Sequence, residues 1–441
     1  DPSMSPRRRV ALTLADTLLA VEASPEAMAA ACARALGQRW PWLPGLCRRL
    51  LQRTQGELHA WSRIELADLI DADAAFERAW ENPDRQPRIV APALDAAPLP
   101  TRPDWLPQHL PRWRSPARLA DWLGLSQEEL GGLTRSWRDA PDAAPHRGHY
   151  AYRWLEKRHG GVRLIESPKS RLREAQRRLL HGFLEHVPVH VAVHGYVRQR
   201  SALTHARQHT GRATVLRFDL ADFFSSVAAS RVHALFATLG CPEAVARQLA
   251  ALCTHRTPRH AFGRADLPFR QRQLLATPHL PQGAPTSPAL ANLCAFRLDL
   301  RLAALAAATG ATYTRYADDL VFSGADGLRR GAATFEARVG AIALEEGFAL
   351  NFRKSRCMGA ATRQTVTGLV VNRFANVPRA EYDELKAILH NCALHGTASQ
   401  NREGRLDFRA HLAGRIAWLA SVHPQRGTRL QTRFDQIDWS R

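Results

Sequence analysis

Two adjacent carboxylates, Asp318 and Asp319, lie between two short runs of strand-forming residues, 311–315 and 320–323. Alternating β-formers on either side of a tight reversal predict a hairpin with the acidic pair at its tip. A hairpin tip holds side chains rigidly and leaves them open to solvent, and carboxylate oxygens so placed suit hard divalent cations. The pair also has a plain alternative, because Asp is a common turn residue.

A third carboxylate, Asp219, ends another strand-like run, 213–220. Leu216 and Phe218 fall on one face of that run and Asp219 on the other, so Asp219 is expected to point away from the core. If the two strands were neighbours in one antiparallel sheet, the three carboxylates would converge. Metal ions held between them could clamp the attacking and leaving oxygens of an in-line phosphoryl transfer. An ordinary strand-end turn is the alternative.

Several helices are predicted around these strands. The run 231–239 has helical spacing and stops at Gly240. Ser287 is expected to cap a helix that has Pro288 at its first position and continues beyond Leu300. Residues 5–80 also have helical spacing, and residues 381–395 and 408–422 carry apolar stripes. The mixture predicts an α+β fold.

The chain of 441 residues carries a formal net charge of +20, which favours nucleic acid as a partner. Basicity alone would also fit a ribosome-associated or purely RNA-binding protein. The seven cysteines include no Cys-x-x-Cys pair, which argues against a disulfide framework and a zinc site. No membrane-length apolar run or secretory signal is visible, so a cytoplasmic location without membrane contact is expected. Met4 is the expected native start.

Four motifs follow one another along the chain: residues 217–224 (Arg-Phe-Asp-Leu-Ala-Asp-Phe-Phe), 280–288 (Leu-Pro-Gln-Gly-Ala-Pro-Thr-Ser-Pro), 316–319 (Tyr-Ala-Asp-Asp) and 347–354 (Gly-Phe-Ala-Leu-Asn-Phe-Arg-Lys). This is the order found in the palm of reverse transcriptases, and the sequence resembles that family, bacterial retron enzymes most closely. Residues 366–368 (Val-Thr-Gly) form a tripeptide typical of retron enzymes. The match runs from about Trp113 to the C-terminus. One departure is His205, which replaces the Asn of the Asn-Ala-x-x-His stretch typical of retron enzymes.

The resemblance implies a right-hand polymerase with fingers, a palm built on an antiparallel sheet, and a helical thumb. The expected divisions are an N-terminal helical extension at 1–81, a Pro-rich linker at 82–111, fingers and palm at 112–377, and the thumb at 378–441. The thumb would grip a template–primer duplex. A plain helical bundle with a solvated basic face is the alternative for residues 378–441.

The resemblance also implies a metal site. Asp219 and Asp318 would be direct ligands of two Mg²⁺ ions, with Mn²⁺ as a substitute, and Asp319 would support them. The backbone carbonyl of Leu220 would be a further ligand. Lys354 would protonate the leaving pyrophosphate as a general acid, and its alternative is a solvated surface lysine.

Nucleotide contacts follow from the same resemblance. Phe224 would exclude a 2′-hydroxyl by its bulk, although Phe223 is adjacent and one of the two rings must face inward. Arg163 is the first candidate for holding the triphosphate, because arginine suits bidentate phosphate contact. The complete nucleotide-binding set is Arg163, Lys169, Arg173, Asp222, Phe224, Gln282 and Gly283. The expected RNA-binding set is His209, Val366, Thr367, Gly368, Arg409 and Arg415.

The function implied is that of an RNA-directed DNA polymerase that uses dNTPs to copy part of a cognate structured noncoding RNA into short single-stranded DNA. Retron enzymes prime from a guanosine 2′-hydroxyl, leave a branched RNA–DNA product and serve antiphage defence with a separate effector protein. Two alternatives stay open. One is another bacterial defence-associated or group II intron-like reverse transcriptase. The other is a nucleic-acid-holding scaffold that restrains a toxin.

Overall fold

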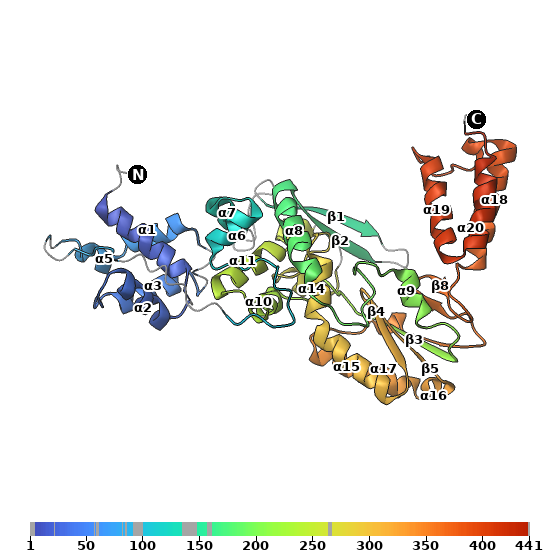
Figure 1. The fold of residues 1–441 in the computed structure, drawn as a ribbon, viewed down its shortest axis with the longest axis horizontal. Helices are drawn as coiled ribbons and strands as arrows, with labels where there is room; N and C mark the ends of the chain where they lie inside the picture. The colour runs from blue at the N-terminus through green and yellow to red at the C-terminus, as the bar shows by residue number, and fades with distance from the viewer. Residues whose placement is uncertain are drawn as a thin grey trace. The chain divides into compact units, whose positions relative to one another are not determined.

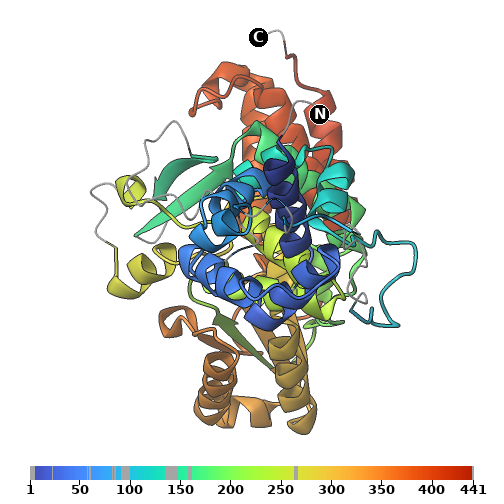
Figure 2. The same ribbon diagram turned by 90° about the vertical axis from the view of Figure 1, so that its left-hand side faces the viewer.

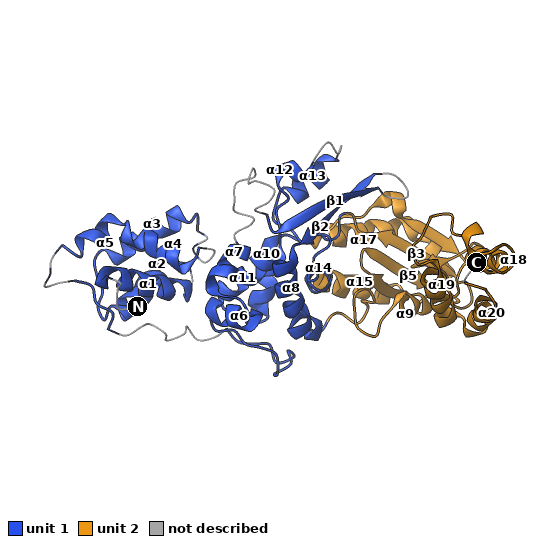
Figure 3. Cartoon of the chain, turned by 90° about the horizontal axis from the view of Figure 1, so that it is seen from above, with its two compact units in different colours: residues 1–188, 222–294 blue, residues 189–221, 295–441 orange. Residues whose placement is uncertain are grey.

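The computed structural model describes residues 5–21, 23–56, 58, 61–81, 83, 86–90, 100–134, 148–156, 161–262 and 267–439. The chain forms two compact units (Figure 3). Unit 1 comprises residues 1–188 and 222–294, and unit 2 comprises residues 189–221 and 295–441. The chain therefore passes from one unit to the other three times. The middle of the expected Pro-rich linker, residues 91–99, lies outside the described residues.

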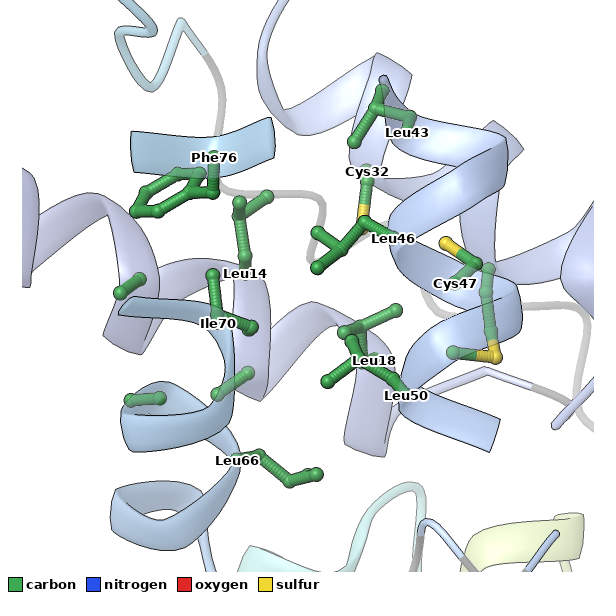
Figure 4. Packing of buried hydrophobic residues seen from close by; sticks show 14 of the residues in the cluster. Leu14, Leu18, Cys32, Leu43, Leu46, Cys47, Leu50, Leu66, Ile70 and Phe76 are labelled. Atoms are coloured by element: carbon green, nitrogen blue, oxygen red, sulfur yellow. The ribbon is translucent and has the colours of Figure 1, made fainter. Parts of the chain in front are cut away.

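The N-terminal part of unit 1 is helical, as its spacing predicted. The helices are α1 (Pro6–Leu19), α2 (Pro25–Ala35), α3 (Leu43–Arg53), α4 (Arg63–Asp71) and α5 (Ala74–Arg78). Ser62 and Glu65 form a capping box at the start of α4. Leucines from several of these helices and Phe76 lie together in one apolar core (Figure 4). Cys32 and Cys47 lie in this core, and all seven cysteines of the chain are free thiols.

The rest of unit 1 combines one antiparallel strand pair with short helices. Strand β1 (Tyr150–Glu156) pairs with β2 (Val162–Pro168). The helices of this part are α6 (Pro116–Leu123), α7 (Gln127–Thr134), α8 (Ser170–Gly182), α10 (Ala229–Thr238), α11 (Glu243–Cys253), α12 (Arg259–Phe262), α13 (Phe269–Leu275) and α14 (Ser287–Cys294). Helix α10 confirms the helix expected at 231–239.

The helix expected from Ser287 past Leu300 is wrong in two details. The helix breaks at Ala295, so that α14 ends at Cys294 and α15 (Phe296–Ala308) begins a new helix in unit 2. Ser287 lies inside α14, and its hydroxyl donates to the Pro281 carbonyl at 2.7 Å instead of capping the helix. Capping preferences thus located the start of the helix to within a residue, but the local pattern did not reveal the break.

Unit 2 is built on a four-stranded antiparallel sheet in the order β4-β5-β3-β6. The strands are β3 (Thr214–Asp219), β4 (Thr312–Tyr316), β5 (Asp319–Gly324) and β6 (Arg356–Gly359). Phe218 and Phe322 of the sheet pack against Phe335 of α17 (Ala332–Glu345), which lies beside α15 (Figure 1). The short helix α16 (Asp326–Arg330) also lies beside α17.

The opposite face of the sheet is also covered. Val215 and Val321 join a core formed with the hairpin β7 (Thr365–Val366) and β8 (Leu369–Val370) and the C-terminal helices. The short helix α9 (Ala202–Arg207) contacts β7 and β8 on this face of the sheet. These helices, α18 (Arg379–His395), α19 (Phe408–Val422) and α20 (Pro424–Asp435), lie side by side in both ribbon views (Figures 1 and 2). The helices expected at 381–395 and 408–422 are confirmed. None of the described helices has the length and apolarity that a bilayer span requires.

Candidate active site

The three carboxylates lie together at one end of the unit 2 sheet. Asp219 is the last residue of β3 and pairs directly with Asp319, the first residue of β5. Asp318 occupies the turn between β4 and β5, and its backbone carbonyl accepts a hydrogen bond from the Leu220 amide at 2.9 Å. The predicted hairpin is therefore confirmed. The pairing of β3 with β5 also confirms the prediction that the strand of Asp219 and the hairpin are neighbours in one antiparallel sheet.

Two cations partner these carboxylates. Arg217, on the same face of β3 as Asp219, donates to Asp319 at 2.8 and 3.0 Å. The Lys354 ammonium donates to both carboxylate oxygens of Asp219 at 2.9 Å. Lys354 is therefore not a freely solvated surface lysine, although its side chain is half exposed. Arg217 is a site residue that the sequence reasoning missed.

The expectation that Asp219 points away from the core is wrong, because only 5% of the residue is exposed. Alternation along β3 does place Asp219 opposite Phe218, but both faces of this sheet are covered, so Asp219 is buried although Arg217 on the same face stays partly exposed. A period-two pattern distinguishes two faces, and it does not show which face is solvated.

Burial and mutual repulsion set the electrostatics of the acidic pair. Burial, reinforced by the charges of Asp219 and Asp319, raises the pKa of Asp318 to about 6. Burial also raises the pKa of Asp319, and the Arg217 guanidinium partly offsets this rise. Two crowded carboxylates in a low-dielectric site attract a further cation.

The donor chemistry fits a hard divalent cation. Among the described residues, no three Asp, Glu, His or Cys side chains converge on one metal-sized point. Arg217 engages Asp319 and Lys354 engages Asp219, and the raised pKa of Asp318 reflects burial and a repulsion from both neighbours that a further cation would relieve. Carboxylate and carbonyl oxygens are the ligands that Mg²⁺ prefers.

Two residues expected to bind RNA have no access to it in this structure. His209 is fully buried, and its ring nitrogens are hydrogen-bonded to the Ser323 hydroxyl at 2.7 Å and the Thr314 hydroxyl at 2.6 Å. Val366 is fully buried in the core shared with the C-terminal helices. Both side chains tie elements of unit 2 together, and we correct their assignment accordingly.

The remaining RNA-binding candidates are more accessible. Thr367 and Gly368, with φ of 44° and 81°, form the turn between β7 and β8, and the Thr367 hydroxyl donates to the Ala202 carbonyl of α9 at 3.1 Å. Arg409 is exposed and stacks over the Trp439 ring at 5.6 Å. Arg415 is half-buried and donates to Glu384 at 3.3 Å.

His205, where retron enzymes typically carry Asn, lies behind the active-site turn. It is fully buried, and its ring centroid is 5.7 Å from those of both Tyr316 and His209. Burial lowers the pKa of His205 to about 2, so the ring is neutral. The imidazole fills a packed position beside Tyr316 without adding charge to it.

Unit 1 carries the nucleotide-binding candidates, and it brings three of them to one strand. Arg163 is exposed on β2. The Gln282 carbonyl accepts a hydrogen bond from the Glu166 amide of the same strand at 2.9 Å. A Cβ at Gly283, whose φ is 133°, would lie 2.8 Å from the Glu166 carbonyl oxygen. The close approach that Gly283 permits is therefore to the β2 backbone.

The other nucleotide-binding candidates of unit 1 lie on other elements than β2. Lys169 is exposed at the start of α8, and Arg173 donates to the Pro168 carbonyl of its own chain at 2.7 Å. Asp222 adopts a positive φ of 51°. Phe223 is buried and Phe224 is only partly covered, which agrees with the expectation that one of the two rings faces inward.

A buried polar network behind β2 was not anticipated. The Glu166 carboxylate accepts a hydrogen bond from the Thr257 hydroxyl at 2.6 Å and pairs with His279 Nε2 at 2.9 Å. Burial lowers the pKa of His279, but the charge of Glu166 and its hydrogen bond outweigh it and raise the pKa above its ordinary value. Burial raises the pKa of Glu166, and His279 likewise reverses this and lowers it. The pair joins β2 to the segment that leads into Gln282.

Comparisons with known proteins agree with these features. Residues 155–371 match the family model described as reverse transcriptase (RNA-dependent DNA polymerase). The chain is 40% identical over 331 residues to the retron Mx65 reverse transcriptase of Myxococcus xanthus, which covers 74% of this chain and 72% of that protein. The retron Mx162 enzyme of the same organism is 37% identical, with 73% of this chain and 66% of that protein covered.

A more distant relative extends the same group. The retron Ec86 reverse transcriptase of Escherichia coli is 29% identical over 280 residues, covering 63% of this chain and 77% of that protein. Sequence motifs, their order and the extent of these matches agree. The chain belongs to the bacterial retron reverse transcriptases, a family of RNA-directed DNA polymerases.

Proposed function

We propose that this chain copies a cognate structured noncoding RNA into single-stranded DNA at the end of the unit 2 sheet. The observation that carries the proposal is the direct register pairing of Asp219 with Asp319, which brings Asp318 beside them in the connecting turn. The unit 2 sheet would be the palm, the β1–β2 pair would belong to the fingers, and helices α18 to α20 would be the thumb.

Asp219 and Asp318, with the Leu220 carbonyl, would hold two Mg²⁺ ions or Mn²⁺ in their place. Such ions, when bound, polarise the attacking hydroxyl and neutralise phosphate charge. Arg217 keeps Asp319 turned aside, in a supporting role. Lys354, whose ammonium donates to Asp219 at 2.9 Å, would donate a proton to the leaving pyrophosphate.

Unit 1 would supply the nucleotide contacts. Arg163, with Lys169 and Arg173 behind it, would hold the triphosphate through charge-assisted hydrogen bonds. Phe224 would stand under the sugar and exclude a 2′-hydroxyl, with Asp222 beside it. Gln282 and Gly283 would support the nucleotide through their loop, whose position depends on the Glu166 amide.

The finer retron function is part of the same proposal. The product would be a branched RNA–DNA molecule primed from a guanosine 2′-hydroxyl, and the system would serve antiphage defence with a separate effector protein. Thr367, Gly368, Arg409 and Arg415 remain the candidate RNA contacts, because each is at least partly exposed or lies in a turn.

The first experiment replaces the acidic pair. In the variant Asp318→Ala with Asp319→Ala, DNA synthesis on the cognate RNA should fall to background while RNA binding persists, since the site loses two carboxylates and no RNA-facing group. The matched control is Asp326→Ala, which removes an exposed carboxylate of the same unit that pairs with nearby Arg329. Unchanged polymerisation in the double variant would contradict the site.

The second experiment identifies the nucleic acid that co-purifies with the protein. A branched species that is shortened by both DNase and RNase is expected. Plain RNA alone would contradict the retron product. If such RNA were bound tightly by a wild-type chain that makes no DNA, the scaffold function would replace the polymerase.

The third experiment tests sugar selection. Phe224→Ala should increase the incorporation of ribonucleotides relative to deoxynucleotides, because truncation of the half-exposed ring leaves room for a 2′-hydroxyl. The matched control is the buried neighbour, for which Phe223→Leu should leave the sugar preference unchanged. Competition between GTP and dGTP in single-nucleotide extension measures the effect, and an unaltered ratio in Phe224→Ala would remove this residue from the gate.

A further inference from the structure

The turn that carries the acidic pair contains a backbone conformation that is unfavourable by itself and must be maintained by its surroundings. Ala317 adopts a φ of 55°, in the left-handed region that residues with a Cβ rarely enter. Such a conformation persists where the surroundings over-determine it. The question is therefore which groups hold Ala317, because its position fixes Asp318 and Asp319.

Beneath the turn lies a fully buried ion pair. Arg315 of β4 makes two parallel hydrogen bonds of 2.7 Å to the carboxylate of Asp299 on α15. The Tyr313 hydroxyl donates to the same carboxylate at 2.7 Å. The third guanidinium nitrogen of Arg315 donates to the Ala317 carbonyl at 3.0 Å. The pair thus connects a helix outside the hairpin to the peptide that begins the acidic dipeptide.

We propose that the Asp299–Arg315 pair is a positioning device, which holds the Ala317 carbonyl and thereby fixes the turn that presents Asp318 and Asp319. This inference rests on the proposed role of that turn in catalysis. Asp299 and Arg315 act through Ala317, and neither touches the reacting atoms.

Fold stability alone does not account for such a pair. Replacing a buried ion pair by apolar side chains of similar volume is often neutral or stabilising, so charge is a costly way to fill this space. What an apolar pair cannot supply is a donor to the Ala317 carbonyl. A planar guanidinium can bind two carboxylate oxygens and a carbonyl at once, whereas an ammonium cannot reproduce that geometry.

A second contact acts on the same turn from the edge of β4. The Arg315 amide donates to the Ala192 carbonyl at 2.8 Å, and the His194 amide donates to the Arg315 carbonyl at 2.7 Å. A Cβ at Gly195 would lie 2.5 Å from the Ala317 amide nitrogen. Arg315 is therefore fixed along its backbone while its side chain holds Ala317, which leaves the turn little freedom.

The test replaces both charges by apolar side chains, in the variant Asp299→Leu with Arg315→Met, in the full-length chain with its RNA. Hydrogen–deuterium exchange of residues 316–320 reports on the turn without reference to activity. We expect faster exchange there, a kcat lower by up to about 100-fold, and a KM for dNTP close to that of the wild type. A folded double variant with wild-type exchange and kcat would overturn the proposal.

One further variant covers the case in which the double variant does not fold, and another serves as a control. If the double variant does not fold, Arg315→Lys retains the charge beside Asp299 but lacks the fork, and wild-type exchange in that variant would overturn the proposal. Arg301→Met is the control, because it breaks a partly exposed ion pair of the same helix with Glu346 and should change neither readout. If the wild type makes no DNA, the proposed function fails, and the exchange difference still decides the positioning role.

Discussion

Each unit of this protein holds a loop that carries candidate residues with a buried ion pair, and the two pairs differ in kind. In unit 2, Asp299 pairs with Arg315 and through it holds the Ala317 carbonyl. In unit 1, Glu166 pairs with His279, and the Glu166 amide holds the Gln282 carbonyl. Both pairs are fully buried, and both support a strand whose neighbouring loop carries candidate residues.

The difference lies in what happens when one partner is lost. Arginine stays charged at every accessible pH, so Arg315 without Asp299 would leave a charge in the core. Histidine can release its proton, so His279 without Glu166 can become neutral. The choice between arginine and histidine therefore decides whether a buried ion pair keeps its charge at every accessible pH or depends on protonation.

The largest expected effect comes from removing the acid of each pair. Asp299→Ala should lower the free energy of unfolding of unit 2 by about 3–5 kcal/mol, because the Arg315 charge is stranded. Glu166→Ala should cost unit 1 less, about 1–3 kcal/mol, because His279 can neutralise and leaves only unpaired polar groups. Urea-dependent hydrogen exchange of peptides from each unit measures both, since two units need not unfold together. Equal losses would contradict the comparison.

A glycine makes a close contact at each of the two loops. Replacing these glycines should affect different kinetic constants, kcat for the glycine of unit 2 and the KM for dNTP for the glycine of unit 1. In Gly195→Ala the new Cβ would meet the Ala317 amide at 2.5 Å, so the acidic turn must move and kcat should fall by up to about 100-fold. In Gly283→Ala the Cβ would meet the Glu166 carbonyl at 2.8 Å, so the Gln282 loop must move and the KM for dNTP should rise instead.

The control for both glycines is Gly414→Ala, because a Cβ at Gly414 in α19 meets nothing within 4 Å. Steady-state extension with a single dNTP measures kcat and KM in all three variants. If Gly195→Ala changed only KM, or Gly283→Ala changed only kcat, the division of roles between the units would be wrong.

Local patterns predicted the parts of this site that depend on neighbouring residues. The β4–β5 hairpin, the strand ending at Asp219 and helix α10 follow from periodicity, turn residues and caps, all of which act within a few positions. Adjacency likewise predicted that one of the rings of Phe223 and Phe224 faces inward, although it did not predict which one.

The supports of the site could not be predicted in this way. Lys354 and Asp219 are 135 positions apart, and Glu166 and His279 are 113 apart, so no local pattern links them. Arg315 could be read as part of a strand but not as the partner of Asp299, since partner choice is decided by how α15 packs on β4. His209 was misassigned for the same reason, because a motif gives a residue's position without its burial.

The smallest expected effect is the pH dependence of the two pairs. The raised folded pKa of His279 contributes stability that is fully present below its ordinary value of 6.5 and is lost as pH rises through the folded pKa. The lowered folded pKa of Glu166 contributes stability that is present above 4.5 and is lost as pH falls through the folded pKa. Urea titrations from about pH 6 to about pH 9 should therefore show the advantage of wild type over His279→Asn shrinking as pH rises. The advantage of wild type over Asp299→Ala should stay constant over that range, because Arg315 does not titrate there, and parallel pH profiles for the two variants would show that the supports do not differ in kind.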